Sequence, residues 1–239
     1  MIKQAFILAA GYGTRMRPLT DKIPKPIVEV NGQSIISRSL DQLLEYGIQH
    51  IIINAFYKKE LLIKHIEDYI KSSTAKPKIT ILEEDELLDT GGGVLNALQY
   101  LEDEPFFVVN SDSIFFGPNV FFTLNKSWSD SMNSLFLLST LEKSHGHDGR
   151  GDFNLDTKNQ LVQNTDPKYA FCGVHITKPK IFYDLEIKPT KLLVDIYSKY
   201  KKSYTYQGFY GEIYSGLWFH VGTPESVKKT ETSLKNLQK

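Results

Sequence analysis

Short apolar runs alternate with amphipathic segments over the first half of the chain. The runs are "AFILA" at 5–9, "HIIIN" at 50–54, "KITIL" at 78–82 and "FFVVN" at 106–110, and their length is typical of buried parallel strands. The segment "SIISRSLDQLLEYG" spaces its apolar residues as a helix does and stops at Gly47. Further helices are expected over "KKELLIKHIEDYIKS" and from the glycines of "DTGGGVLNALQYLED". This rhythm predicts an α/β fold, with a parallel sheet covered by helices on both faces.

The pattern loosens from about residue 134. Shorter β-like segments follow, namely "SLFLLST", "GDFNLD", "QLVQN", "AFCGVHI", "YTYQGFYGEIY" and "LWFHV". We interpret them as mixed or antiparallel strands that extend the sheet, and we expect a closing helix from about Pro224. Since no fixed-period repeat, linker or low-complexity segment divides the chain, a single domain over 1–239 is expected.

The composition narrows the classes of function. With 239 residues, 41% of them hydrophobic, the chain can bury a substantial core. Its 28 Lys and Arg residues balance 28 Asp and Glu residues, which argues against nucleic acid or a membrane surface as a partner. The single cysteine, Cys172, excludes an intramolecular disulfide and agrees with a reducing cytoplasm. The first apolar run is too short to span a membrane, so we expect a soluble, cytoplasmic protein.

A glycine loop, "GYGTRM", follows the first predicted strand. It resembles a dinucleotide-binding fingerprint, but Met16 replaces the third glycine, which weighs against a nicotinamide-dependent oxidoreductase. Glycines let backbone N–H groups approach a ligand, and Arg15 and Lys25 follow, the latter between two prolines that fix its backbone. Arg forms forked bonds to phosphoryl oxygens and Lys supplies a point charge. The segment therefore predicts a triphosphate site, with Arg17 and Lys22 as solvated surface charges.

Three further segments carry candidate chemistry. Asp112 follows the strand "FFVVN", and a carboxylate at a strand end either holds Mg²⁺ together with phosphate oxygens or is an ordinary turn residue. The glycines of "TGGG" either leave a backbone edge open to a base or let a helix start against the sheet. His145 and His147 in "HGHDGRGD" lack the cysteine pair or helical histidine spacing of a zinc site. We interpret that segment as a loop.

The segment "LAAGYGTRMRPLTDKIPKPIVEVNGQSII" resembles the signature of the sugar-1-phosphate nucleotidylyltransferases. The resemblance continues through "DTGGGVLNAL", "FFVVNSDSI", "HDGRGDF", "FCGVHI" and "LWFHVGTPESV", and so covers nearly the whole chain. Within this family, the short chain, "TGGG" and "GRGDF" look most like the N-acetylmuramate-1-phosphate uridylyltransferases of bacterial cell-wall recycling. The mannose-1-phosphate guanylyltransferases are similar over the first half and stay the alternative.

The resemblance implies the nucleotide-diphospho-sugar transferase fold, a Rossmann-like three-layer α/β/α arrangement with a mostly parallel central sheet. Its nucleotide-binding half would span about 1–112 and its sugar-binding half about 113–239. Arg15, Lys25 and Asp112 would be catalytic. The residues implied for the nucleotide are Ala10, Gly11, Gly13, Thr14, Glu83, Thr90, Gly91, Gly92 and Gly93. Those implied for the sugar are Asn110, Gly151, Asp152 and Gly173.

Two positions depart from the family pattern. His220 stands where members commonly carry the aspartate that is the second metal carboxylate, and Ser111 replaces the usual glycine before Asp112. An imidazole suits Mn²⁺, Zn²⁺ or Ni²⁺ better than Mg²⁺. We expect the metal at Asp112, held either with phosphates and waters alone or with His220 as a second ligand; otherwise His220 is a strand-end histidine that touches no metal. The expected cofactor is Mg²⁺, with Mn²⁺ as the alternative ion. A nucleotide-sugar-binding protein with weakened catalysis is a competing interpretation.

The reaction that the resemblance implies is the attack of a sugar 1-phosphate on the α-phosphorus of a nucleoside triphosphate, with release of pyrophosphate. A phosphate monoester is ionised at neutral pH, so no general base is needed. Catalysis then consists of holding two polyanions together and neutralising the developing charge. The expected partners are these small molecules, and the sequence leaves a homo-oligomer open.

Overall fold

Four parallel strands form one side of the main sheet, with the last of them at its edge, in the computed structural model, which describes residues 1–147, 149–163 and 165–237. In pairing order they are β6 (Phe106–Asn110), β1 (Gln4–Leu8), β4 (His50–Ala55) and β5 (Lys78–Glu83). They coincide with the four apolar runs, because strands covered on both faces need apolar residues at nearly every position. The parallel sheet predicted for the first half is confirmed. Asp148 of "HDGRGDF" and Asn164 of "QLVQN" lie outside the described residues.

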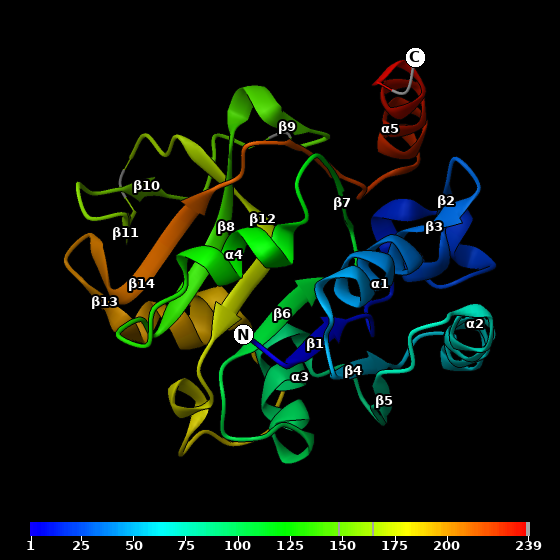
Figure 1. Cartoon of the computed structure of the whole chain (residues 1–239), viewed down its shortest axis with the longest axis horizontal. Coiled ribbons are helices and arrows are strands. Elements are labelled where there is room, and N and C mark those ends of the chain that lie inside the picture. The colour runs from blue at the N-terminus through cyan, green and yellow to red at the C-terminus, as the bar shows by residue number, and fades with distance from the viewer. Residues whose placement is uncertain (148, 164, 238–239) are drawn as a thin grey trace.

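Strands of mixed direction extend the sheet beyond β6. β12 (Tyr169–Thr177) runs antiparallel to both β6 and β8 (Ser134–Thr140), and β14 (Thr205–Ile213) is parallel to β8. The remaining members are β11 (Gln160–Val162), β10 (Asn154–Leu155) and β13 (Lys201–Lys202). The sheet crosses the molecule from β10 and β11 to β5 (Figure 1). The prediction that the second half extends the sheet is thus confirmed for these strands.

Helices cover both faces of the sheet. α1 (Ile35–Tyr46), α2 (Lys59–Ser72) and α4 (Val120–Ser127) contribute to one buried hydrophobic cluster, whereas α3 (Asp89–Ala97) contributes to the cluster on the opposite face. α1 ends at Gly47, whose φ of 87° is left-handed, as predicted from its position after the last apolar residue. α4 was not predicted, since "VFFTLNKS" is too short to show a helical period. The result is the predicted three-layer arrangement.

The predicted strand "LWFHV" does not extend the main sheet. It forms β15 (Leu217–His220), which pairs with β7 (Ser113–Phe116) and β9 (Ser144–His145) in a separate three-stranded sheet. The reason is that the chain turns after β6 and continues into β7, whose edge is free to pair with β15. The antiparallel register of β15 and β7 sets His220 opposite Ser113 and thus beside Asp112 in the site.

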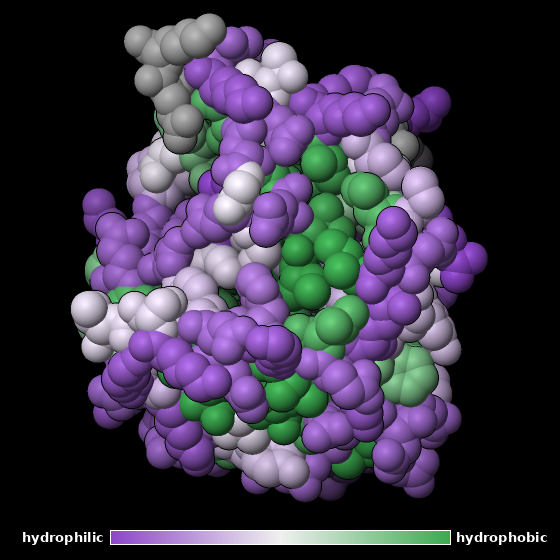
Figure 2. All heavy atoms as spheres, turned by 90° about the vertical axis from the view of Figure 1, so that its right-hand side faces the viewer, coloured by the Kyte–Doolittle hydropathy of each residue, from purple (hydrophilic) through white to green (hydrophobic). Residues whose placement is uncertain are grey.

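The final helix, α5 (Pro224–Leu237), starts where predicted and packs on the small hairpin of β2 (Glu29–Val30) and β3 (Gln33–Ser34). The side of the molecule that carries α2, β2, β3 and α5 is mainly hydrophilic, with hydrophobic residues gathered in a strip (Figure 2). Arg17 and Lys22 are exposed, in agreement with their interpretation as surface charges. Among the described helices, none is both long and apolar enough to cross a membrane.

Candidate active site

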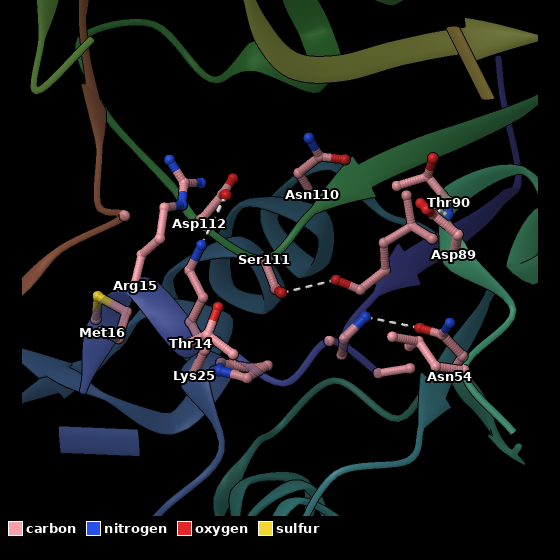
Figure 3. A pocket seen from close by; sticks show the side chains of 18 residues that line it. Thr14, Arg15, Met16, Lys25, Asn54, Asp89, Thr90, Asn110, Ser111 and Asp112 are labelled. Carbon is pink, nitrogen blue, oxygen red and sulfur yellow. Dashed lines mark hydrogen bonds and ion pairs between the residues drawn. The ribbon is translucent and has the colours of Figure 1, made fainter. Parts of the chain in front are cut away.

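A cavity of about 350 Å³ opens at the carboxyl ends of β1, β4 and β6. This is the edge at which ligands of parallel sheets bind. Figure 3 shows Arg15, Lys25 and Asp112 at one end of the cavity, Asn54, Asp89 and Thr90 at the other, and Asn110 and Ser111 between them. The predicted site residues that line it are Ala10, Gly11, Gly13, Thr14, Arg15, Lys25, Thr90, Asn110 and Asp112. Residues from four separate segments of sequence therefore meet in one place.

The glycine loop packs tightly against the loop that carries Lys25. Gly13 has a left-handed φ of 63°, and a Cβ on it would lie 2.9 Å from the Lys25 Cβ. The Thr20 hydroxyl donates to the Gly13 carbonyl at 2.8 Å. Only glycine combines this conformation with so close an approach. The local fold thus brings Arg15, which follows Gly13 in a 3₁₀ turn, to the same end of the cavity as Lys25.

Lys25 and His220 converge on one oxygen of Asp112. Lys25 Nζ lies 2.8 Å from Asp112 Oδ2, and His220 Nε2 lies 3.4 Å from the same atom. Burial acts to raise the pKa of Asp112, but the charge of Lys25 and the neighbouring His220 outweigh burial, so this pKa lies well below its usual range. The carboxylate is therefore ionised and ready to act as an acceptor or a metal ligand.

Arg15 lies beside this cluster with its guanidinium free. It makes no hydrogen bond or ion pair with any residue in the described part of the chain. The guanidinium and the His220 ring both lie over Gly222, because a Cβ there would be 3.6 Å from Arg15 Nη2 and 3.2 Å from His220 Nε2. A cation without an internal partner, on the wall of a cavity, is suited to binding an anion.

Sequence reasoning missed a buried polar pair at the other end of the cavity. Asn54 accepts from the Ala9 N–H at 2.6 Å and donates to Glu84 Oε1 at 2.7 Å. The second oxygen of Glu84 accepts from the Leu88 N–H at 3.2 Å. Burial raises the pKa of Glu84, although both of its hydrogen bonds oppose the rise. The pair ties the end of β1 to the loop before α3. The only signal in the sequence was the polar residue that ends the run "HIIIN".

Some residues predicted for the nucleotide lie away from the cavity. Glu83 forms an ion pair with Lys59, with Oε2 2.8 Å from Nζ. The Gly91 and Gly92 N–H groups both donate to the Thr190 carbonyl, at 2.7 and 3.1 Å. Neither glycine lines the cavity, and these N–H groups are occupied within the protein. Thr90 does line it, and its hydroxyl accepts from the Leu192 N–H at 3.0 Å, which leaves its proton for a ligand.

Residues predicted for the sugar are divided between the cavity and its surroundings. Asn110 lines the cavity and packs on Gly173, where a Cβ would lie 3.0 Å from the Asn110 amide nitrogen. Asp152 accepts from the Phe171 N–H at 2.8 Å, two residues before Gly173 on β12. Gly151 and Asp152 do not line the cavity. The structure therefore brings Asn110 and Gly173 together and leaves Gly151 and Asp152 in the adjoining part of the fold.

The donor atoms near Asp112 determine which metal fits. In the described ranges, no group of three or more His, Cys, Asp and Glu side chains gathers as a metal site would require. Mg²⁺ is commonly held by one or two carboxylates, substrate phosphates and waters, and Asp112 fits the role of the carboxylate. The His220 imidazole suits a transition-metal ion better than it suits Mg²⁺.

The chain is similar to known nucleotidyl transferases along nearly its whole length. A family model described as "Nucleotidyl transferase" matches residues 4–236. The N-acetylmuramate alpha-1-phosphate uridylyltransferases of Caulobacter vibrioides and Neisseria meningitidis are 34% and 31% identical, covering 97% and 95% of this chain and 97% and 96% of their own. Mannose-1-phosphate guanylyltransferase 1 of Arabidopsis thaliana is 27% identical over 92% of this chain and 62% of its own.

Two solved structures share the fold. HddC from Yersinia pseudotuberculosis has a TM-score of 0.77 at 23% identity, with 98% of this chain and 100% of that chain covered. Apo UDP-glucose pyrophosphorylase has a TM-score of 0.78 at 18% identity, with both chains covered completely, at 100% each. These similarities confirm the fold class predicted from the sequence.

Proposed function

The chain belongs to the nucleotidyl transferase family, and on that premise we propose that it is a sugar-1-phosphate nucleotidylyltransferase. Its proposed substrates are UTP and N-acetylmuramate 1-phosphate, and its products UDP-N-acetylmuramate and pyrophosphate. The observation that carries the proposal is the division of one cavity into a cationic end, with Arg15 and Lys25 beside Asp112, and a middle and far end, with Asn110, Asp89 and Thr90, that have no lysine or arginine among the described lining residues. A triphosphate with an attached nucleoside has the same division.

The side chains present account for the chemistry without a general base. Arg15, which has no internal partner among the described residues, would bind the phosphates through forked hydrogen bonds. Lys25, held beside Asp112, would neutralise charge that develops on the α-phosphate and the pyrophosphate. Asn110 and its neighbour Gly173 would hold the sugar phosphate near the reacting phosphorus. A divalent ion on Asp112 would supply further positive charge to the phosphate oxygens.

The preference for UTP and N-acetylmuramate 1-phosphate rests on the extent of the similarities. The two uridylyltransferase relatives match along nearly their whole length. The guanylyltransferase relative is less similar and extends well beyond the matched region. GTP with mannose 1-phosphate is therefore the contrasting pair of substrates.

A second candidate is a nucleotide-sugar-binding protein with weakened catalysis. It is favoured by the position of His220, which lies 3.4 Å from Asp112 where the family pattern has a second carboxylate. We favour the enzyme, because a metal such as Mn²⁺ accepts one carboxylate and one imidazole. The His220→Asp variant tests this choice. It should raise turnover with Mg²⁺ relative to Mn²⁺, and the control His145→Asn, on the neighbouring β9, should leave that ratio unchanged.

The proposed activity is tested by mass spectrometry of the product. Purified protein is incubated with UTP and N-acetylmuramate 1-phosphate, with Mg²⁺ and Mn²⁺ in parallel. Formation of UDP-N-acetylmuramate supports the proposal. Binding of the nucleotide sugar without its formation, with either ion, would favour the binding protein.

A further inference from the structure

Ser111 lies on the floor of the cavity, between its cationic end and its far end (Figure 3). It follows β6 directly, is 8% exposed, and donates from its hydroxyl Oγ to the backbone oxygen of Leu8 at 2.7 Å. Both residues line the cavity. The hydroxyl thus links the ends of β6 and β1 at the surface that a bound nucleotide would cover.

The bond to Leu8 determines how this hydroxyl can act on a ligand. A serine hydroxyl has one proton and two acceptor lone pairs, and the proton is engaged with the Leu8 carbonyl. Ser111 can therefore accept a hydrogen bond from a ligand, but it has no proton left for a phosphate oxygen or a base carbonyl. The ligand group that it can bind is therefore a donor, either a hydroxyl or an N–H group.

The position of Ser111 indicates that the ligand group that donates to its hydroxyl belongs to the ribose. With the triphosphate at Arg15 and Lys25, and the base toward Thr90, the ribose that joins them would lie over the middle of the cavity, where Ser111 is. We propose that Ser111 accepts a hydrogen bond from the 2′- or the 3′-hydroxyl of the ribose of the bound nucleoside triphosphate, and thereby favours this nucleotide over the analogue that lacks that hydroxyl. This inference rests on the proposed function and deepens it. The glycine of the family pattern has no side-chain acceptor, so the selection is specific to the serine of this chain.

The test is the affinity of the full chain for UTP, 2′-deoxy-UTP and 3′-deoxy-UTP, measured by calorimetry with Mg²⁺. The sugar 1-phosphate is left out, so that its hydroxyls cannot contribute. One neutral hydrogen bond corresponds to roughly a 2- to 12-fold difference in affinity. We expect UTP to bind tighter than one of the two deoxy analogues by such a factor, and the analogue that loses affinity identifies the hydroxyl.

The variants Ser111→Ala and Ser111→Gly should bring this ratio close to one. Because the ratio compares two ligands on the same protein, a change in stability does not alter it. The control Ser72→Ala removes an exposed hydroxyl on α2 that also donates to a backbone carbonyl, that of Tyr69 at 2.8 Å, and should leave the ratio as in the wild type.

Equal affinity of the wild type for all three nucleotides, or a ratio unchanged in both Ser111 variants, would overturn the inference and leave the proposed function standing. Binding of GTP in place of UTP would correct the proposed base, and the same ratios with GTP and its deoxy analogues would then decide on Ser111. Failure of every nucleoside triphosphate to bind would overturn both.

Discussion

Lys25 Nζ lies 2.8 Å from Asp112 Oδ2, although the two residues are 87 positions apart in the sequence. The lysine side chain is 14% exposed and the carboxylate 21%. Pro24 and Pro26 restrict the backbone on either side of Lys25, and the turn after β6 places Asp112 opposite. A cation and a carboxylate, each suited to a different part of a metal-bound triphosphate, are thus held together before any ligand binds.

Removing this lysine should abolish most of the turnover. We expect Lys25→Ala to lose about 10²-fold or more in kcat, by analogy with the loss of one donor to a developing anion. The matched control is Lys22→Ala, since Lys22 is exposed and lies outside the cavity lining. Pyrophosphate release measures turnover, and circular dichroism confirms that both variants are folded. Turnover near that of the wild type in a folded Lys25→Ala protein would remove Lys25 from the mechanism.

Alanine substitutions at two arginines that are separated by one residue should differ sharply in their effect on activity. Arg15 lines the cavity, whereas Arg17 is exposed and pairs with Asp21, with Nε 3.2 Å from Oδ1. Exposed pairs of this kind contribute about 0–1 kcal/mol to stability. We expect Arg15→Ala to weaken both nucleotide binding and turnover, by about 10²-fold in kcat/KM, while Arg17→Ala stays close to the wild type. Equal losses in steady-state kinetics of the two variants would contradict the assignment of Arg15.

Alanine substitutions at two glycines should differ in their effect on stability. A Cβ on Gly92 would lie 2.3 Å from the backbone oxygen of Lys188, whereas a Cβ on Gly11 would meet nothing within 4 Å. We expect Gly92→Ala to lower the free energy of unfolding by about 1–3 kcal/mol, as overpacking does. Gly11→Ala should keep its stability. Urea denaturation of both variants is the measurement, and equal stabilities would show that the segment around Lys188 shifts without cost.

The free energy of unfolding should decrease as the pH is lowered, because of a buried histidine that does not line the cavity. His175 is 1% exposed, and its Nε2 lies 2.8 Å from the Tyr197 hydroxyl. Burial lowers the pKa of His175 from 6.5 to about 3, so the folded protein keeps the ring neutral while the unfolded chain takes up a proton below about pH 6.5. The unfolded state binds more protons between these values, and stability is therefore lost as the pH falls through this range.

The conservative variant His175→Gln isolates this effect. Between pH 7 and pH 5, the wild type should lose about 2 kcal/mol more of its free energy of unfolding than His175→Gln does. Comparing the two proteins cancels the contribution of carboxylates that titrate in both. An identical loss in the two proteins would mean that His175 is protonated in the folded state.

Features set by local patterns could be read from the sequence. The four parallel strands follow from short apolar runs, and the end of α1 follows from a glycine after the last apolar residue. The position of β15 could not be predicted from the sequence, because its pairing with β7 instead of the main sheet depends on which strand edge the folded chain leaves free. That pairing is what sets His220 beside Asp112.

The buried pair of Asn54 and Glu84 could also not be predicted from the sequence. Each is an unremarkable polar residue at a strand end, and only the parallel register of β4 and β5 brings their side chains together. The glycines of "TGGG" had two open interpretations. The Gly91 and Gly92 N–H groups are used within the fold, which favours their role in starting α3 against its neighbours.

Pyrophosphate release from each combination of nucleotide and sugar 1-phosphate tests the proposed reaction directly. UTP and GTP are each combined with N-acetylmuramate 1-phosphate and with mannose 1-phosphate, in the presence of Mg²⁺ or Mn²⁺. We expect the highest kcat/KM for UTP with N-acetylmuramate 1-phosphate, and the loss of this activity in Lys25→Ala. Release only with GTP and mannose 1-phosphate would contradict the proposed substrates, and no release with any pair and either ion would contradict the proposed activity.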